Sequence, residues 1–251
     1  MSPLLMSILA VGALSLVSLV GVATLAMKEE FLRRALFLII SLAAGALLGD
    51  AFIHLIPEAF AESNPLFVSA LILAGFLAFF VLEKFLHWHH SHGEDEFSPE
   101  HARIHPIGHL VIISDGVHNL IDGLAIGAAF LVSTEVGIAT TIAIALHEIP
   151  QEIGDFGLLV HAGFSRRKAL LMNFLSALTA FIGVGLAFWL SQLGTMAAPL
   201  IAAFAAGNFI YIAAADLVPE LHKTTGVGRS LLQFITILIG LAAMVMLLGL
   251  E

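Results

Sequence analysis

Two groups of polar residues interrupt long apolar stretches of this chain, at residues 118–123 (HNLIDG) and 147–155 (HEIPQEIGD). Positions i and i+4 share one face of a helix, so His118 lies beside Asp122 and His147 beside Gln151. Imidazole nitrogen with carboxylate and amide oxygen suits zinc, iron(II) or manganese(II), with cadmium as a mimic, whereas magnesium and calcium prefer oxygen alone. The spacing therefore predicts a metal-cation site between two helices. Its candidate ligands are His118, Asn119, Asp122, His147, Glu148, Gln151 and Glu152.

The composition places these helices in a membrane. Hydrophobic residues make up 59% of the 251 residues and charged residues 12%, with a mean hydropathy of +1.02, which excludes an ordinary soluble domain. A helix needs about 20 residues to cross the hydrocarbon. We therefore expect an all-α integral membrane protein, with one domain over residues 1–251 and about eight spanning helices. The expected spans are 4–27, 35–60, 65–86, 106–131, 135–161, 169–191, 196–220 and 230–250.

The ten Lys and Arg residues predict the orientation of the chain. They fall in or beside alternate connections, while the connections around 61–65, 133–135 and 193–196 carry none. The positive-inside rule makes the basic face cytoplasmic, so both termini lie outside a cell (inner) membrane and residues 87–105 form a cytoplasmic loop. Histidines in this loop could capture a cation loosely, or the loop is an acidic linker whose histidines bind nothing specific. The capture candidates are His87, His89, His90 and His92.

Two stretches of sequence resemble each other at an offset of 162 residues. AAG at 43–45 matches 205–207, and LIPE at 55–58 matches LVPE at 217–220. The predicted topology runs the two copies in opposite directions, as in inverted-repeat transporters. We expect a 3+2+3 arrangement in which both polar groups lie on the central pair of helices. Chance agreement between two Pro-Glu helix ends is the alternative.

Acidic side chains without basic partners extend beyond the two polar groups. Carboxylates lie within or at the ends of the spans, while no Lys or Arg lies deep in a span. Protons or bound cations must then balance their charge. The candidates for a transport path are Asp50, His54, Glu58, Asp155 and Asp216.

The two motifs resemble those of the ZIP family of divalent-metal transporters, over the whole chain. One subgroup reads HExPHExGD where this chain has Gln151 in place of the second histidine. The resemblance implies movement of zinc or iron(II) toward the cytosol through one site or a binuclear pair between helices four and five. It implies a first site made by His118, Asp122, His147 and Gln151 and a second that includes Asn119 and Glu148. Glutamine is a weaker, neutral ligand, so Gln151 predicts looser binding or another preferred metal.

Two other functions compete with metal transport. An intramembrane zinc protease would need H-E-x-x-H, but Gln151 replaces the second histidine and Pro150 disrupts the helix. A proton- or sodium-coupled carrier of another solute leaves the histidines unexplained. We therefore expect no enzyme activity and no cofactor, with the metal as substrate. Membrane lipid is the other expected partner, nucleic acid is not expected, and a homodimer stays open.

Overall fold

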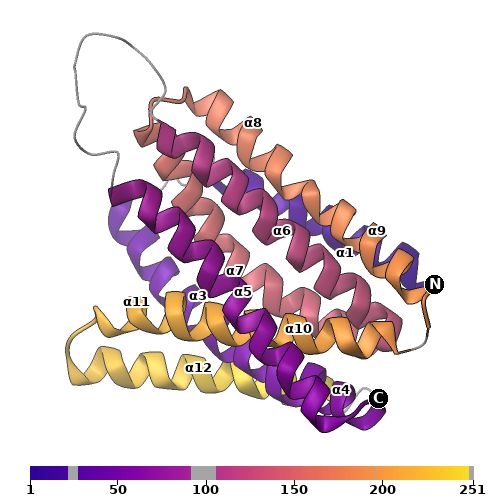
Figure 1. The fold of residues 1–251 in the computed structure, drawn as a ribbon. Coiled ribbons are helices and arrows are strands. Elements are labelled where there is room, and N and C mark those ends of the chain that lie inside the picture. The colour runs from indigo at the N-terminus through magenta and orange to yellow at the C-terminus, as the bar shows by residue number, and fades with distance from the viewer. Residues whose placement is uncertain (22–27, 92–105, 195, 249–251) are drawn as a thin grey trace.

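The computed structural model describes residues 1–21, 28–91, 106–194 and 196–248, and over these residues the chain is built from helices, with no strand. Figure 1 shows their arrangement. In chain order the helices are α1 (Pro3–Val17), η1 (Ser18–Val20), α3 (Glu29–Gly49), η2 (Asp50–Leu55), α4 (Ile56–Glu62), α5 (Pro65–Ser91), α6 (Pro106–Val132), α7 (Thr134–His161), α8 (Arg166–Ala177), α9 (Thr179–Ser191), α10 (Ala197–Tyr211), η3 (Ile212–Leu217), α11 (Val218–His222) and α12 (Val227–Leu248). Helix α5 continues through Ser91, past the predicted start of the loop at residue 87, because no glycine or proline lies between Gly75 and Gly93.

The helices have the length and composition of membrane spans. Seven helical stretches within the described residues are long and apolar enough to cross a bilayer. Helix α7, at 28 residues, is as long as the others but is more polar and is not one of these seven stretches. The chain is therefore an all-α, multi-pass membrane protein, as expected from its composition.

Two groups of helices meet at the pair α6 and α7. Helices α1, α8 and α9 pack against this pair on one side (Figure 1). On the other side α3 packs along α12 and α5 along α10, and these two pairs reach the centre through the contacts of α3 with α7 and of α10 with α6. The polar residues of α6 and α7 therefore lie at the junction of the two groups.

The two halves of the predicted repeat share a local deformation. Helix α3 passes into a π-helical segment at Asp50–Leu55, and α10 does so at Ile212–Leu217, which is the same place at the offset of 162 residues. Proline follows each segment, at Pro57 and Pro219. Because proline lacks an N–H, it leaves a carbonyl one turn earlier without its α-helical bond, which favours a wider turn there. The shared deformation supports the inverted repeat.

The paired helices of the two repeats also make equivalent close contacts. A Cβ at Gly45 would lie 2.1 Å from the carbonyl oxygen of Ile237 in α12, and one at Gly207 would lie 2.0 Å from that of Ile72 in α5. Gly45 and Gly207 occupy equivalent repeat positions. Only glycine allows two backbones to approach so closely, so these contacts hold α3 to α12 and α10 to α5 as compact pairs.

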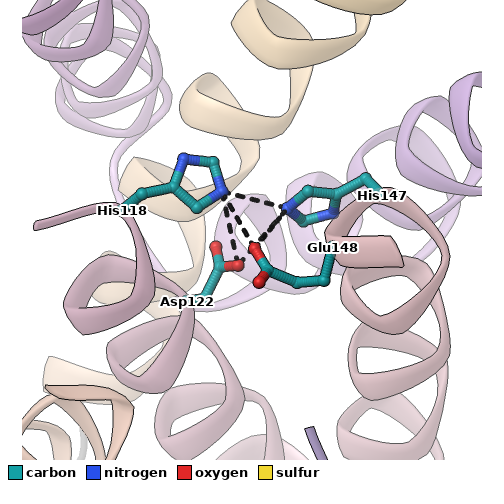
Figure 2. Close-up of side chains that lie close together, drawn as sticks. All are labelled: His118, Asp122, His147 and Glu148. Carbon is teal, nitrogen blue, oxygen red and sulfur yellow. Dashed lines mark hydrogen bonds and ion pairs between the residues drawn. The ribbon is translucent and has the colours of Figure 1, made fainter. Parts of the chain in front are cut away.

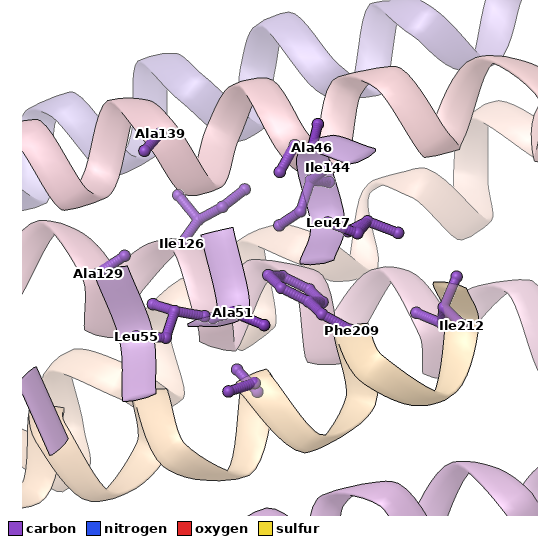
Figure 3. Close-up of a cluster of buried hydrophobic side chains, with 14 of the residues drawn as sticks. Ala46, Leu47, Ala51, Leu55, Ile126, Ala129, Ala139, Ile144, Phe209 and Ile212 are labelled. Carbon is purple, nitrogen blue, oxygen red and sulfur yellow. The ribbon is translucent and has the colours of Figure 1, made fainter. Parts of the chain in front are cut away.

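An apolar cluster fills the region between α6, α7, α3 and α10 on one side of the polar residues (Figure 3). Helix α6 contributes Ile126 and Ala129, which follow Asp122 along the chain, and α7 contributes Ala139 and Ile144, which precede His147. All four apolar side chains are at most 1% exposed. The chain is therefore closed around one end of the central pair.

Candidate metal centre

Four side chains from α6 and α7 converge at the middle of the pair (Figure 2). The two ring nitrogens, Nε2 of His118 and Nε2 of His147, are 3.1 Å apart. Oδ2 of Asp122 lies 3.6 Å from the first and 3.3 Å from the second. Oε1 of Glu148 lies 3.4 Å from the first and 3.6 Å from the second. We call these four residues the four-residue centre.

The spacing of these atoms fits one transition-metal ion. In a tetrahedral site with bonds of about 2.0–2.1 Å, neighbouring ligand atoms lie about 3.3–3.4 Å apart. The five distances above, 3.1–3.6 Å, bracket that value. One ligand atom from each residue lies within 4.8 Å of every other. Two nitrogens and two oxygens at this spacing form a donor set of the size that a tetrahedral ion requires.

The charge of the four-residue centre favours a cation. All four side chains are buried, and both carboxylate oxygens of Asp122 and Oε1 of Glu148 have no hydrogen-bond partner among the described residues. Within the same part of the chain, their ion pairs are with His118 and His147 and not with Lys or Arg. Buried carboxylates are costly unless a cation or proton compensates them. A divalent cation bound by the four atoms would supply that charge.

Neighbouring groups orient the two imidazole rings. Nδ1 of His147 lies 3.3 Å from the carbonyl oxygen of Ala143, which leaves Nε2 directed at the centre. The Phe79 ring packs edge-on against His118 at 5.2 Å between centroids, and Phe209 lies 6.3 Å from His147. The rings are therefore held in place from behind by a carbonyl and by apolar groups.

Two predicted ligands, Asn119 and Gln151, contact another carboxylate. Nδ2 of Asn119 donates to Oδ1 of Asp115 at 2.8 Å and to its backbone oxygen at 3.1 Å. Nε2 of Gln151 makes a long contact of 3.5 Å with the same Oδ1. The Ser176 hydroxyl from α8 donates to Oδ2, the other carboxylate oxygen of Asp115. The amides thus lie beside the four-residue centre, with their nitrogens turned to Asp115.

Glu152, another predicted ligand, is bound on a different side of α7. Nδ2 of Asn173 in α8 donates to its Oε2 at 2.7 Å and to its backbone oxygen at 3.1 Å. Both side chains are buried. The structure therefore places Glu152 at the contact between α7 and α8, outside the four-residue centre.

A cavity of about 380 Å³, lined by both polar and apolar side chains, leads away from the centre toward one end of the molecule. His118 and His147 lie at its inner end, and the path candidates Asp155 and Asp216 are in its wall. Its wall comes from the first half of α6, the second half of α7, and parts of α3, α5, η3 and α11. The centre therefore opens to this side through a cavity that has carboxylates in its wall.

The other path candidates lie on the opposite side of the centre. Oδ1 of Asp50 is 3.3 Å from Nδ1 of His54, and the Thr140 hydroxyl donates to Oδ2 of Asp50 at 2.8 Å. Thr140 precedes His147 by two helical turns, about 10 Å along the axis of α7. Glu58 follows in α4 and is half-buried. None of these residues lines the cavity.

The histidines proposed to capture metal lie outside the residues whose side chains the structure describes. His92 lies outside the described residues, and the side chains of His87, His89 and His90 also lie outside them although their backbone belongs to α5. Their role stays a prediction.

Sequence reasoning missed Asp115 and its α8 partner Ser176 as parts of the site. Asp115 precedes Asn119 by four residues, so the shared helical face was a usable signal. Ser176 lies 61 residues away along the chain, and the sequence around Asp115 does not predict a contact with it.

Comparison with known proteins agrees with a membrane protein that has a candidate metal site. A family profile described as "ZIP Zinc transporter" matches residues 2–106 and 89–248, which together cover nearly the whole chain. The chain belongs to the ZIP family. This ZIP protein is therefore a membrane transporter for metal cations and not an enzyme.

Individual relatives extend this result. The chain is 31% identical to zinc transporter YKE4 of Saccharomyces cerevisiae, over 88% of its own length and 73% of the relative. It is 35% identical to zinc transporter ZIP13 of Pongo abelii, over 83% and 65%. It is 34% identical to metal cation symporter ZIP14 of Homo sapiens, over 86% and 60%. The ZIP protein thus spans about two thirds of the length of these relatives.

Proposed function

We propose that this ZIP protein moves zinc, or a similar cation such as iron(II), manganese(II) or cadmium, across the membrane through the four-residue centre. The observation that carries the proposal is the closed set of two imidazole nitrogens and two carboxylate oxygens with 3.1–3.6 Å between them. Mixed nitrogen and oxygen ligands favour these metals over magnesium and calcium. Relatives named zinc transporters and a metal cation symporter agree with this range.

The same geometry argues against a zinc protease. A catalytic zinc has three protein ligands and keeps a fourth position for water. Here the residue that would serve as the protease general base, Glu148, lies as close to the two ring nitrogens as Asp122 does. It is therefore placed as a fourth ligand, which suits a cation that is held and released.

Movement toward the cytosol is part of the proposal. The cavity leads toward the end of the molecule where α7 ends and α8 begins, and α8 opens with Arg166, Arg167 and Lys168. The positive-inside rule assigns such a cluster to the cytoplasmic face. A cation that dissociates from the centre in this conformation leaves on that side. The His-rich segment on the same face is proposed to capture metal loosely.

Uptake into proteoliposomes tests the proposal. A zinc indicator inside the vesicles should report uptake by the natural chain and none above background for His147→Ala, because loss of a ligand lowers metal affinity by about 100-fold or more. His161→Ala changes an exposed histidine at the end of the same helix and should transport normally. Cadmium, iron(II) and manganese(II) should compete with zinc, and magnesium and calcium should not. Equal uptake by the natural chain and His147→Ala would contradict the proposal.

A further inference from the structure

Three consecutive basic residues, Arg166, Arg167 and Lys168, begin helix α8, and we call them the basic turn. All three are exposed, and the first turn of the helix contains no acidic residue. Within the described part of the chain, Arg34 and Lys223 have carboxylate partners, whereas the basic turn has none. A helix N-terminus already carries a partial positive charge, so three further cations there repel the helix dipole and one another. The basic turn therefore favours an anion that the described chain does not supply.

The basic turn lies at the surface of the membrane. It begins the apolar stretch Arg166–Ser191, which is long enough to cross a bilayer and comprises α8 and α9. At 1.5 Å per residue its 26 residues extend about 39 Å, whereas the hydrocarbon layer is about 30 Å thick. Because charged side chains are costly inside the hydrocarbon, the excess length places the basic turn among the lipid headgroups.

Apolar side chains continue along the same face of α8. Leu171 and Leu175 follow Arg167 at intervals of four residues, so the three side chains share one face. The two leucines are 51% and 47% exposed. Exposed apolar side chains of a membrane span contact the acyl chains of lipids. One face of α8 thus offers positive charge at headgroup level and apolar contacts beyond it, which matches the two parts of a phospholipid.

The Phe164 ring restrains Lys168 and connects it to the start of α6. Nζ of Lys168 lies 5.0 Å from the centroid of this ring, and the His109 imidazole packs edge-on against it at 5.8 Å between centroids. Phe164 is itself buried, and a Cβ at Gly108 would lie 2.6 Å from its Cε2, so the ring is wedged against α6. A cation held over an aromatic ring keeps its position at the surface. Lys168 is therefore restrained beside an exposed imidazole that can donate a hydrogen bond.

We propose that the basic turn binds the phosphate of an anionic phospholipid whose acyl chains lie along Leu171 and Leu175. The Arg167 guanidinium has a fork of N–H donors that matches two phosphate oxygens, and Lys168 adds a restrained point charge. A phospholipid with net negative charge is favoured over phosphatidylcholine, because the cationic headgroup of phosphatidylcholine is repelled by the basic turn. Free phosphate would meet the same charges without the leucine contacts, so the lipid is the better occupant.

Native mass spectrometry of the purified full chain tests the inference. Titration with phosphatidylglycerol should show a bound lipid, and a chain with both Arg167→Gln and Lys168→Gln should bind it about tenfold more weakly. The matched control carries Arg34→Gln and Lys223→Gln, which remove two exposed basic side chains that already pair with glutamates. It should bind phosphatidylglycerol as the natural chain does. Equal binding by the natural chain and the Arg167 and Lys168 variant, or an equal loss in the control, would overturn the inference.

The identity of the lipid and the folding of the variant are measured separately. Phosphatidylcholine should bind the natural chain about tenfold more weakly than phosphatidylglycerol, and equal binding of the two lipids would contradict recognition of an anion. Excess inorganic phosphate should not displace phosphatidylglycerol, and displacement would assign the site to free phosphate instead. The glutamine variant should unfold at the natural temperature in phosphatidylcholine. Phosphatidylglycerol should then raise the melting temperature of the natural chain alone, since a ligand stabilises only the form that binds it.

A charge-preserving variant completes the test. A chain with Arg167→Lys and Lys168→Arg keeps both positive charges and should bind phosphatidylglycerol within about threefold of the natural chain. A loss as large as that of the glutamine variant would show that charge is not what the lipid recognises. These measurements follow lipid binding directly, so their outcome is independent of metal transport.

Discussion

The two ends of the α6 and α7 pair differ although the same two helices build both. On the cavity side of the four-residue centre, the pair presents Ser114, Asp115, Gln151 and Asp155, beside apolar residues, to an open space. On the other side it presents small and branched apolar side chains that pack without exposed surface. The difference shows a protein that is closed on one side of the four-residue centre and open on the other.

The two repeats show the same contrast in equivalent residues. His54 in η2 is 3% exposed and pairs with Asp50 inside the closed half. Asp216, its equivalent at the offset of 162 residues, is exposed in the wall of the cavity beside η3. Equivalent positions of an inverted repeat therefore lie in different environments. Exchange of these environments between the repeats would open the closed side, which is the behaviour that alternating access requires.

Thiol labelling offers the largest contrast between the two ends. The chain has no cysteine, so single cysteines can be introduced without background. Ser114→Cys lines the cavity and should react fully with a small charged thiol reagent, whereas Ala129→Cys lies in the apolar cluster and should stay unlabelled. Mass spectrometry of the two proteins measures the difference. Equal labelling would show that the closed side is open to water.

A comparison of Glu148→Gln with Glu152→Gln tests whether Glu148 is a metal ligand and Glu152 only a contact between α7 and α8. Glu148→Gln removes a charged ligand and should lower zinc affinity about 100-fold. Glu152→Gln keeps an oxygen that can accept from Asn173, so its zinc affinity and uptake should stay within about twofold of the natural chain. Calorimetric zinc titration measures both. A large loss of affinity in Glu152→Gln would return Glu152 to the ligands.

Ile144→Ala probes the packing of the closed end. Ile144 is 1% exposed in the apolar cluster, and truncation leaves a void that should cost about 2 kcal/mol or more of stability. Leu110→Ala, in the wall of the open cavity, leaves no enclosed void and should cost less. Thermal unfolding of both variants in one detergent compares them. A smaller shift in melting temperature for Ile144→Ala than for Leu110→Ala would contradict a tightly packed closed end.

Gln151→His should have the smallest effect. It introduces the histidine of the motif that this sequence resembles, and imidazole is a stronger ligand for zinc than an amide. Zinc affinity should rise about tenfold, or roughly 1.4 kcal/mol, and the ratio of iron(II) to zinc transport should change. Gln151→Asn serves as the control that keeps an amide. Unchanged affinity and selectivity would show that position 151 contacts only Asp115.

Most of the four-residue centre was predictable from local sequence. His118 and Asp122 share a helical face, and His147 with Glu148 begins the second motif, so the types and spacing of these residues predicted a shared metal site. The membrane class followed from apolar length alone. The partners of the remaining predicted ligands were harder to predict, because an amide or carboxylate on a helix can contact several neighbouring groups. Asn119 and Gln151 turned to Asp115, and Glu152 turned to Asn173.

The sequence by itself determined the helices, their membrane setting, the repeat and the residue types of the four-residue centre, because these depend on periodicity and composition within short stretches. Only the tertiary structure decided that four of the candidate ligands meet at 3.1–3.6 Å. It also decided that Ser176 from a distant helix holds Asp115, and which end of the central pair is closed. These properties depend on how separate helices pack, and packing between helices has no counterpart in the local order of residues.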